Sequence, residues 1–198
     1  MKVLKVEHIR NDEQLWRAFK QGDKNALSEI YYAQYEYLFN YGLKISREED
    51  LVKDCIHELF CELIRKKQNL GNTDSIRFYL FKAFKRKLLK EIRKGSKLVS
   101  SESTLQENHD FSVEFSFEEQ LIRQEMSEAQ QQKLKHELGN LSKRQKEVIF
   151  LKFYADLSNQ QIGEVMALND QSVRSLLYKT LKKLKELMLL FFFLSFAD

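Results

Sequence analysis

The chain has 198 residues, of which 43% are hydrophobic and 31% charged, with a formal net charge of +4, so it can bury a core. It contains no proline and six glycines, whereas ordinary usage gives about ten prolines and fourteen glycines at this length. This scarcity of turn-forming residues argues against a β-sandwich or barrel and favours an all-α protein. Its cysteines, Cys55 and Cys61, exclude a disulfide framework and fit a reducing compartment. With no signal peptide and no transmembrane segment in view, we expect a cytoplasmic protein.

The first hundred residues predict a small helical bundle. Residues 22–42 have the pattern of an aromatic-rich helix whose rings mostly belong to a core. Ser46 and Glu49 have capping-box spacing, and a second helix is expected to follow them. Residues 72–75 break that helix, and residues 76–94 begin another. The apolar stripe of the helix after Ser46 comprises Leu51, Val52, Cys55, Ile56, Leu59, Phe60, Leu63 and Ile64, opposite Asp50, Asp54, His57 and Glu58. The stripe of the next helix comprises Leu80, Phe84, Leu88 and Ile92.

Charge divides the chain into three blocks. Residues 76–94 hold eight basic side chains and one acidic one, Glu91. Residues 95–128 hold eight acidic side chains and two basic ones, and their serine-rich beginning has no helical period. From residue 138 onward, nine bases stand against six acids. The pattern indicates two basic modules joined by an acidic linker.

A helix-turn-helix is expected near the C-terminus. Ser142 with Gln145, and Ser158 with Gln161, have capping-box spacing, and Asn169 is a good N-cap for a last helix. The expected inner residues are Ile162, Val165 and Met166 of the first helix and Val173, Leu176, Leu177, Leu181 and Leu184 of the second. Polar side chains at the start of the second helix can contact bases, and Lys179, Lys182 and Lys183 can contact phosphates.

These pieces together resemble a known family. Residues 54–64 (DCIHELFCELI) followed by residues 75–94 (SIRFYLFKAFKRKLLKEIRK) resemble region 2 of the sigma factors of bacterial RNA polymerase, and residues 141–184 resemble region 4. Two such regions without a middle domain are the layout of extracytoplasmic-function sigma factors. The resemblance implies two small helical domains and a flexible linker. Its segments are region 2 at residues 1–94, the acidic linker at 95–131, region 4 at 132–188 and a hydrophobic tail at 189–198.

The resemblance also implies a function and its residues. The chain is expected to bind core RNA polymerase, recognise the −10 and −35 elements of promoter DNA, assist melting and act without a cofactor, small-molecule substrate or enzymatic activity. The expected polymerase contacts are Asp54, His57 and Glu58. The expected −10 contacts are Tyr79 and Phe81, which would support an unstacked base, and Lys82, Lys85, Arg86 and Lys90, which would follow the backbone. The expected −35 contacts are Gln171, Ser172, Arg174, Ser175 and Lys179. An anti-sigma factor, membrane-anchored in many cases, is an expected further partner.

Some positions depart from the family pattern. His57 stands where glutamine is usual and Ile64 where tryptophan is usual. Arg86 and Lys90 replace the common asparagine and aspartate, so the −10 contact is expected to rely more on charge than on base readout. The proline that usually precedes the region 4 helix is absent.

Other interpretations were weighed beside this one. His57 and Cys61 have metal-ligand spacing, but no further His or Cys cluster supports a zinc site, and no metal is expected. No catalytic motif is present. The rival hypotheses are a conventional helix-turn-helix regulator with an N-terminal dimerisation or sensing module, and a helical interaction protein without a DNA role. The apolar tail at residues 187–196 either extends the last helix onto its own module or docks elsewhere.

Overall fold

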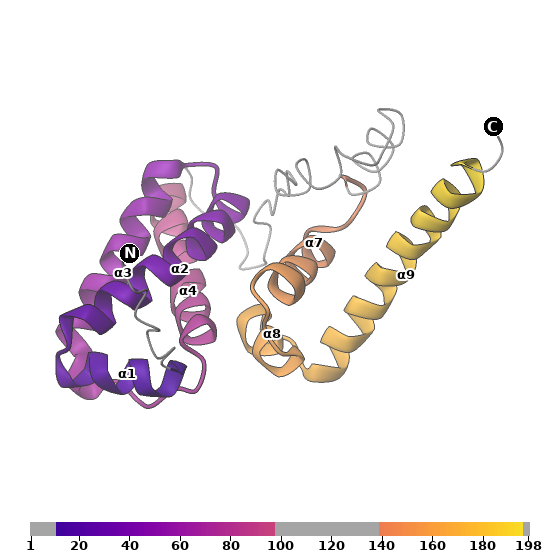
Figure 1. The fold of residues 1–198 in the computed structure, drawn as a ribbon. Helices are drawn as coiled ribbons and strands as arrows, with labels where there is room; N and C mark the ends of the chain where they lie inside the picture. The colour runs from indigo at the N-terminus through magenta and orange to yellow at the C-terminus, as the bar shows by residue number, and fades with distance from the viewer. Residues whose placement is uncertain (1–10, 98–138, 196–198) are drawn as a thin grey trace, which may run out of the picture. The chain divides into compact units, whose positions relative to one another are not determined.

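The computed structural model of the chain describes the backbone of residues 11–97 and 139–195, and the side chains of residues 11–95 and 139–185. These residues form helices and turns, with no strand among them, which confirms the all-α prediction. They divide into two compact units (Figure 1). One holds α1, most of α2, α3 and α4, and the other holds α7 to α9. Most of the expected acidic linker, residues 98–131, lies outside the described residues.

The N-terminal unit is a bundle of four helices with one short 3-10 turn. In chain order these are α1 (Asp12–Gln21), α2 (Lys24–Ile45), α3 (Glu49–Lys66), the turn η1 (Lys67–Asn69) and α4 (Ile76–Lys97). Helix α3 packs along α4, and α1 contacts α4 and η1. The helix expected at residues 76–94 therefore exists and runs one turn further than its predicted end.

The core of this unit is formed by the stripes that the sequence pattern indicated. Each buried aliphatic or aromatic side chain contributes about 1.5–3 kcal/mol relative to an exposed one. Helix α2 approaches α3 and α4 closely at Gly42, where an added Cβ would lie 2.6 Å from Val52 Cγ1 of α3 and 2.9 Å from Phe84 Cζ of α4. Burial raises the pKa of the Cys55 thiol to about 11, so this cysteine is an apolar core residue. The buried residues of α3 and α4 include Val52, Cys55, Ile56, Leu59, Phe60, Leu63, Leu80, Phe81, Phe84 and Leu88.

Two features of this unit differ from the sequence prediction. The capping box expected at Ser46 is wrong, because α3 begins at Glu49 and its N-cap residue is Glu48, which makes no side-chain capping bond. Helix α1 was not predicted as an element; Asn11 caps it by accepting a hydrogen bond from the Gln14 N–H at 2.9 Å.

The C-terminal unit contains α7 (Lys143–Ile149), a π-helical turn η2 (Phe150–Tyr154), α8 (Asn159–Met166) and α9 (Asp170–Ser195). Both predicted capping boxes are confirmed. Ser142 accepts from the Gln145 N–H at 3.3 Å while the Gln145 side chain accepts from the Ser142 N–H at 2.9 Å. The same reciprocal pair of bonds occurs at the start of α8. Helix α9 is a single unbroken helix (Figure 1).

Helices α8 and α9 form the predicted helix-turn-helix. Ala167 ends α8 in the left-handed region with φ at 53°, and Asn169 caps α9 by accepting from the Ser172 N–H at 2.7 Å. Gly163 is buried and allows the turn to approach closely, since an added Cβ would lie 2.7 Å from the Leu168 carbonyl oxygen. Its own carbonyl accepts from the Leu168 N–H at 2.8 Å. These contacts fix where α9 begins relative to α8.

The inner face of α9 is partly different from the predicted one. Val173 and Leu177 are buried as expected, but Leu181 is 42% exposed. Its expected place is taken by Thr180, which is fully buried and donates its hydroxyl to the Leu176 carbonyl at 2.7 Å. A threonine can occupy this core position because that bond satisfies its hydroxyl within the helix.

Candidate nucleic-acid and partner interfaces

The α3 face predicted to contact polymerase is exposed. Asp54, His57 and Glu58 all lie on the solvent side of the helix. Glu58 is not an isolated charge, because the Lys87 ammonium donates to its Oε2 at 3.1 Å and to Glu62 Oε1 at 2.7 Å. Of the two acidic residues on this face, Lys87 therefore engages Glu58 and not Asp54.

Lys87 ties α4 to α3. Its side chain is only 13% exposed, whereas Glu58 and Glu62 are 61% and 38% exposed. Burial lowers the pKa of Lys87, but its hydrogen bonds with Glu62 and Glu58 outweigh this effect and leave the pKa raised. The same contact lowers the pKa of Glu62. Lys87 is therefore a charged bridge within the unit.

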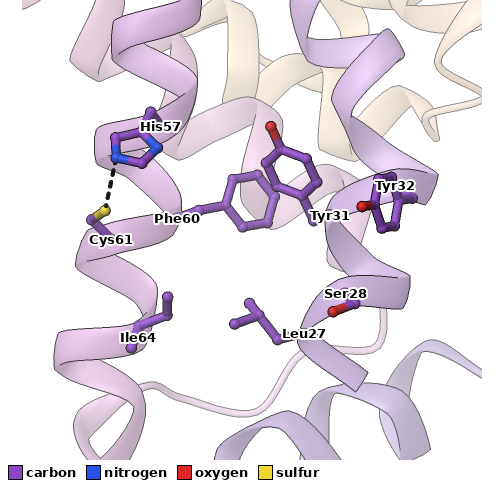
Figure 2. Close-up of a pocket in the computed structure, with 8 residues that line it drawn as sticks. All are labelled: Leu27, Ser28, Tyr31, Tyr32, His57, Phe60, Cys61 and Ile64. Atoms are coloured by element: carbon purple, nitrogen blue, oxygen red, sulfur yellow. Dashed lines mark hydrogen bonds between the residues drawn. The ribbon is translucent and has the colours of Figure 1, made fainter. Parts of the chain in front are cut away.

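A shallow apolar groove of about 240 Å³ lies between α2 and α3. Figure 2 shows the Phe60 and Tyr31 rings side by side between the two helices; their centroids are 4.9 Å apart and their planes are inclined by 70°, an edge-to-face contact. At one side the Cys61 thiol lies 3.5 Å from His57 Nε2. Tyr32 is 80% exposed and Ile64 is 48% exposed, so this groove places apolar surface beside the predicted polymerase face. We call it the α2–α3 groove; it is lined by Leu27, Ser28, Tyr31, Tyr32, His57, Phe60, Cys61 and Ile64.

A second cavity, of about 420 Å³, lies where the segment before α4 meets α1. Its rings come from Phe78 and Tyr79, and burial raises the pKa of the Tyr79 hydroxyl, an effect that the nearby charge of Arg86 opposes. Amide and hydroxyl groups of the connecting segment complete it. We call it the loop pocket; it is lined by Glu13, Asn72, Thr73, Asp74, Phe78 and Tyr79. Only Tyr79 of this set was expected from sequence.

The basic side chains of α4 lie beside this pocket. Lys82, Arg86 and Lys90 are exposed, and helical spacing places them on the same face as Tyr79. Lys82 Nζ lies 5.7 Å from the centroid of the Phe78 ring, and Lys85 is half-buried. The positive charges therefore line one side of α4, next to the aromatic rings.

The prediction that Phe81 supports an unstacked base is contradicted by its burial. Phe81 is fully buried, with its ring centroid 5.0 Å from that of Tyr41. It lies more than half a turn of helix from Tyr79, on the core side of α4. Phe78, one residue before Tyr79, supplies the second ring of the loop pocket instead.

The start of α9 presents the predicted −35 side chains to solvent. Gln171, Arg174, Ser175 and Lys179 are exposed, and Ser172 is half-buried. The Arg174 guanidinium donates to Asp170 Oδ2 at 2.6 Å, which orients it along the helix. By helical spacing this face also includes Tyr178, which is 69% exposed and was not among the predicted contacts. Lys183, a possible phosphate contact, donates to the Asn140 carbonyl at 3.0 Å.

Other expectations concern metals and membranes. Among the side chains that the structure describes, no three His, Cys, Asp or Glu residues gather as a metal ion would need. Within the same residues, no helix has both the length and the apolar character to cross a bilayer. The backbone of α9 continues to Ser195, so the tail does extend the last helix. The side chains of that tail lie outside the described residues.

The C-terminal unit is similar to a known protein family. Residues 131–184 match the family model described as sigma-70, region 4, and these residues contain the helix-turn-helix. These residues are therefore similar to region 4 of the sigma-70 factors. A search of curated proteins found no match to the chain.

Solved structures extend the likeness to most of the chain. One is CnrH in complex with the cytosolic domain of CnrY, with 17% identity and a TM-score of 0.57, covering 90% of this chain and 97% of that one. Another is the sigma factor RpoE in complex with the anti-sigma factor NepR from Bartonella quintana. It has 18% identity and a TM-score of 0.51, and the match covers 83% of this chain and 95% of that one. At this level of identity the likeness concerns the fold. Together the family match and the shared fold confirm the resemblance to sigma-70 factors that the sequence motifs indicated.

Proposed function

We propose that this chain is a sigma factor of the extracytoplasmic-function type, a non-enzymatic transcription initiation factor that binds core RNA polymerase and directs it to promoters. The observation that carries the proposal is the region 4 match over a helix-turn-helix with an exposed polar face. A fold shared with a sigma factor over most of the chain supports it. In this proposal residues 1–94 act as region 2, residues 95–131 link the domains and residues 132–188 act as region 4, before the tail at 189–198.

The polymerase contact is assigned to the exposed α3 face. Asp54 is a carboxylate without the Lys87 bridge, and His57 lies at the edge of the α2–α3 groove. Exposed apolar groups such as Ile64 lie beside this polar face. The charges would select the partner, and the apolar groups would be buried against it on binding. Such a mixed surface suits a contact that forms and releases. Glu58 contributes through the position in which Lys87 holds it.

The −10 contact is assigned to α4 and the loop pocket. Glu13 and Asp74 would repel a phosphate there, whereas Asn72 and Thr73 can bond to a base edge and the rings can stack on a base. Stacking a base on an aromatic ring contributes about 1–3 kcal/mol with little sequence readout. Lys82, Lys85, Arg86 and Lys90 would then hold the phosphates of the flanking single strand.

The −35 contact is assigned to the start of α9, which would lie in the major groove. Gln171, Ser172 and Ser175 would contact base edges, and Lys179 a phosphate. Arg174 would reach a base or a phosphate after exchanging its Asp170 partner. Because the sigma factor RpoE was solved with an anti-sigma factor, an anti-sigma protein is a further proposed partner of this chain.

The test is capture of purified bacterial core RNA polymerase by the tagged full chain. Asp54→Arg is the sharper charge reversal, because Glu58→Arg would also break the Lys87 bridge. The control is Glu29→Arg, which makes the same change at an exposed position of α2. Capture that Asp54→Arg weakens at least tenfold and Glu29→Arg leaves intact would support the proposal. Folded wild-type protein that captures no polymerase would refute it, and a conventional helix-turn-helix regulator that binds a two-fold symmetric site would then be favoured.

A further inference from the structure

The segment before α4 is fastened to α1 by contacts that span more than fifty residues of sequence. The Trp16 indole N–H donates to the Gly71 carbonyl at 2.9 Å, and Lys20 Nζ donates to Asn72 Oδ1 at 3.1 Å. At the other end of the segment, the Ile76 N–H donates to Asp12 Oδ2 at 2.8 Å. Helix α1 thus holds both ends of the segment that lines the loop pocket.

Burial of its own side chains cannot order this segment. Gly71, Asn72 and Asp74 are all exposed, and a glycine adds backbone freedom. Within the segment, the Ser75 N–H donates to Thr73 Oγ1 at 3.2 Å, and at its α4 end Ser75 Oγ accepts from the Phe78 N–H at 3.3 Å. Residues 71, 72 and 74 take no part in these bonds. The position of the pocket wall therefore depends on the bonds to α1.

Helix α1 also fixes the principal ring of the pocket. Trp16 is only 1% exposed, and its ring centroid lies 5.0 Å from that of Tyr79. Asp12 accepts the free N–H of Ile76 at the start of α4, so a residue of one helix caps the helix that carries Tyr79. Trp16 therefore contacts both the ring and the segment facing it, and Asp12 holds the start of the helix that carries the ring.

We propose that Trp16 and Asp12 are positioning residues for base capture: they do not touch DNA, but they hold the loop pocket in the shape that accepts an unstacked base. This inference rests on the proposed function, since it takes single-stranded DNA as the ligand of the pocket. Pre-ordered pocket walls favour binding because the ordering cost is already met in the free protein. Losing either residue should weaken binding of a single strand without affecting the polymerase face on α3.

Trp16 supplies the first measurement, because it is the one tryptophan of the chain. Its emission should change when short oligo(dA), oligo(dT) or oligo(dC) strands are titrated into the full-length protein, since Tyr79 lies between it and the pocket. The Tyr79→Leu variant should abolish most of the change. A strand that only neutralised the α4 lysines would leave the emission nearly constant.

The second measurement compares affinities of labelled strands by fluorescence anisotropy. Trp16→Phe keeps a ring but loses the indole donor, and we expect about 2- to 10-fold weaker binding, the range for one hydrogen bond. Asp12→Ala should weaken binding to a similar degree, whereas Asp12→Asn, which keeps an acceptor oxygen, should restore it. The matched control is Tyr41→Phe, which changes a fully buried ring packed on Phe81 and should bind as wild type.

The outcomes distinguish the positioning role of Trp16 and Asp12 from the base-binding role of the loop pocket. If Trp16→Phe and Asp12→Ala bind single strands as wild type does, while Tyr79→Leu does not, the positioning role is wrong and the pocket stands. If the wild type shows neither binding nor an emission change, the pocket and its positioning residues are both refuted. Capture of core polymerase, measured separately, then decides whether the proposed function survives. Circular dichroism melts identify variants that fail to fold, and the Asp12 pair then replaces Trp16→Phe as the deciding comparison.

Discussion

Gly163→Ala tests how the turn of the helix-turn-helix sets the position of α9. A Cβ at residue 163 would lie 2.7 Å from the Leu168 carbonyl oxygen and 3.7 Å from Val173 Cγ2. The first distance is shorter than real Cβ contacts, and the neighbour is backbone, so the turn itself must move. A flexible side chain could have moved aside at little cost, but this carbonyl belongs to the segment that leads into α9.

The expected magnitude follows from two opposing effects. Replacing a helical glycine by alanine stabilises a helix by about 1 kcal/mol, whereas overpacking a buried site costs about 1–3 kcal/mol. Because the clash is with backbone, we expect the upper part of that range and a net loss of about 1–2 kcal/mol in the free energy of unfolding. For a unit of this size, that loss lowers the thermal midpoint by roughly 4–15 °C.

The assay is differential scanning calorimetry of the full chain, together with its affinity for duplex DNA carrying a −35 element once one is known. Gly95→Ala is the control, because a Cβ there meets nothing within 4 Å and should be neutral or slightly stabilising. The reasoning would be refuted if Gly163→Ala were as stable as Gly95→Ala. Such a result would mean that the turn adjusts freely and does not fix α9.

Further predictions concern the charged bridge and the strained turn. Lys87→Met should lower the unfolding free energy, measured by urea titration, by about 1 kcal/mol, since Glu58 and Glu62 are partly exposed. It should leave the salt dependence of single-strand binding unchanged. Arg86→Met, in contrast, should reduce the slope of log affinity against log salt concentration by about 0.7. Because Lys87 lowers the pKa of Glu62, the ionised carboxylate stabilises the fold at pH values above 4.5, the ordinary pKa, and this contribution is lost as the pH falls through the lowered pKa. Glu62→Gln should therefore reduce the fall in unfolding free energy, measured in urea, on the acid side of the pH profile. An unchanged fall would contradict the bridge. Ala167→Gly should raise the thermal midpoint by a few degrees, because the left-handed conformation costs alanine about 1–2 kcal/mol and the added unfolded-state entropy offsets only about 0.4–1 kcal/mol; a lower midpoint would contradict this.

The sequence predicted the elements whose signals are local. The apolar stripes of α3 and α4 were predicted from helical spacing alone, and most of their residues are buried. The exceptions lie near the ends of the stripes, where Ile64 is exposed and Ile92 is half-buried. The boxes at Ser142 and Ser158 depend on two side chains three residues apart, and both formed. The spacing of residues within one helix is enough to predict its buried face and its capping residues, without knowledge of the rest of the chain.

Predictions failed where another element of the fold decided the outcome. Ser46 had the right spacing to Glu49, but α3 begins at Glu49 itself and its N-cap residue is Glu48. Phe81 was chosen as an aromatic within a basic run, although its neighbour across the core, Tyr41, comes from a different helix. Thr180 is buried where Leu181 was expected, because the packing of α9 against α7 and α8 decides which side of the helix is covered; its hydroxyl is satisfied within α9.

The loop pocket could not have been read from the sequence. Its walls come from residue 13 and from residues 72–79, and their association depends on the long-range bonds of Trp16 and Asp12. Likewise, nothing local distinguished Lys87 from the other cations of α4; only the packing of α3 against α4 places two glutamates on it. A charge run shows that cations are present, whereas the tertiary fold decides which of them face solvent.

The most direct test of the central claim is run-off transcription with purified bacterial core polymerase on fragments of the source genome. With the wild-type chain added, we predict transcripts of defined length that core polymerase alone does not produce. Asp54→Arg should abolish these transcripts, and Glu29→Arg should not. The absence of chain-dependent transcripts, from folded protein across the fragments tested, would contradict the account.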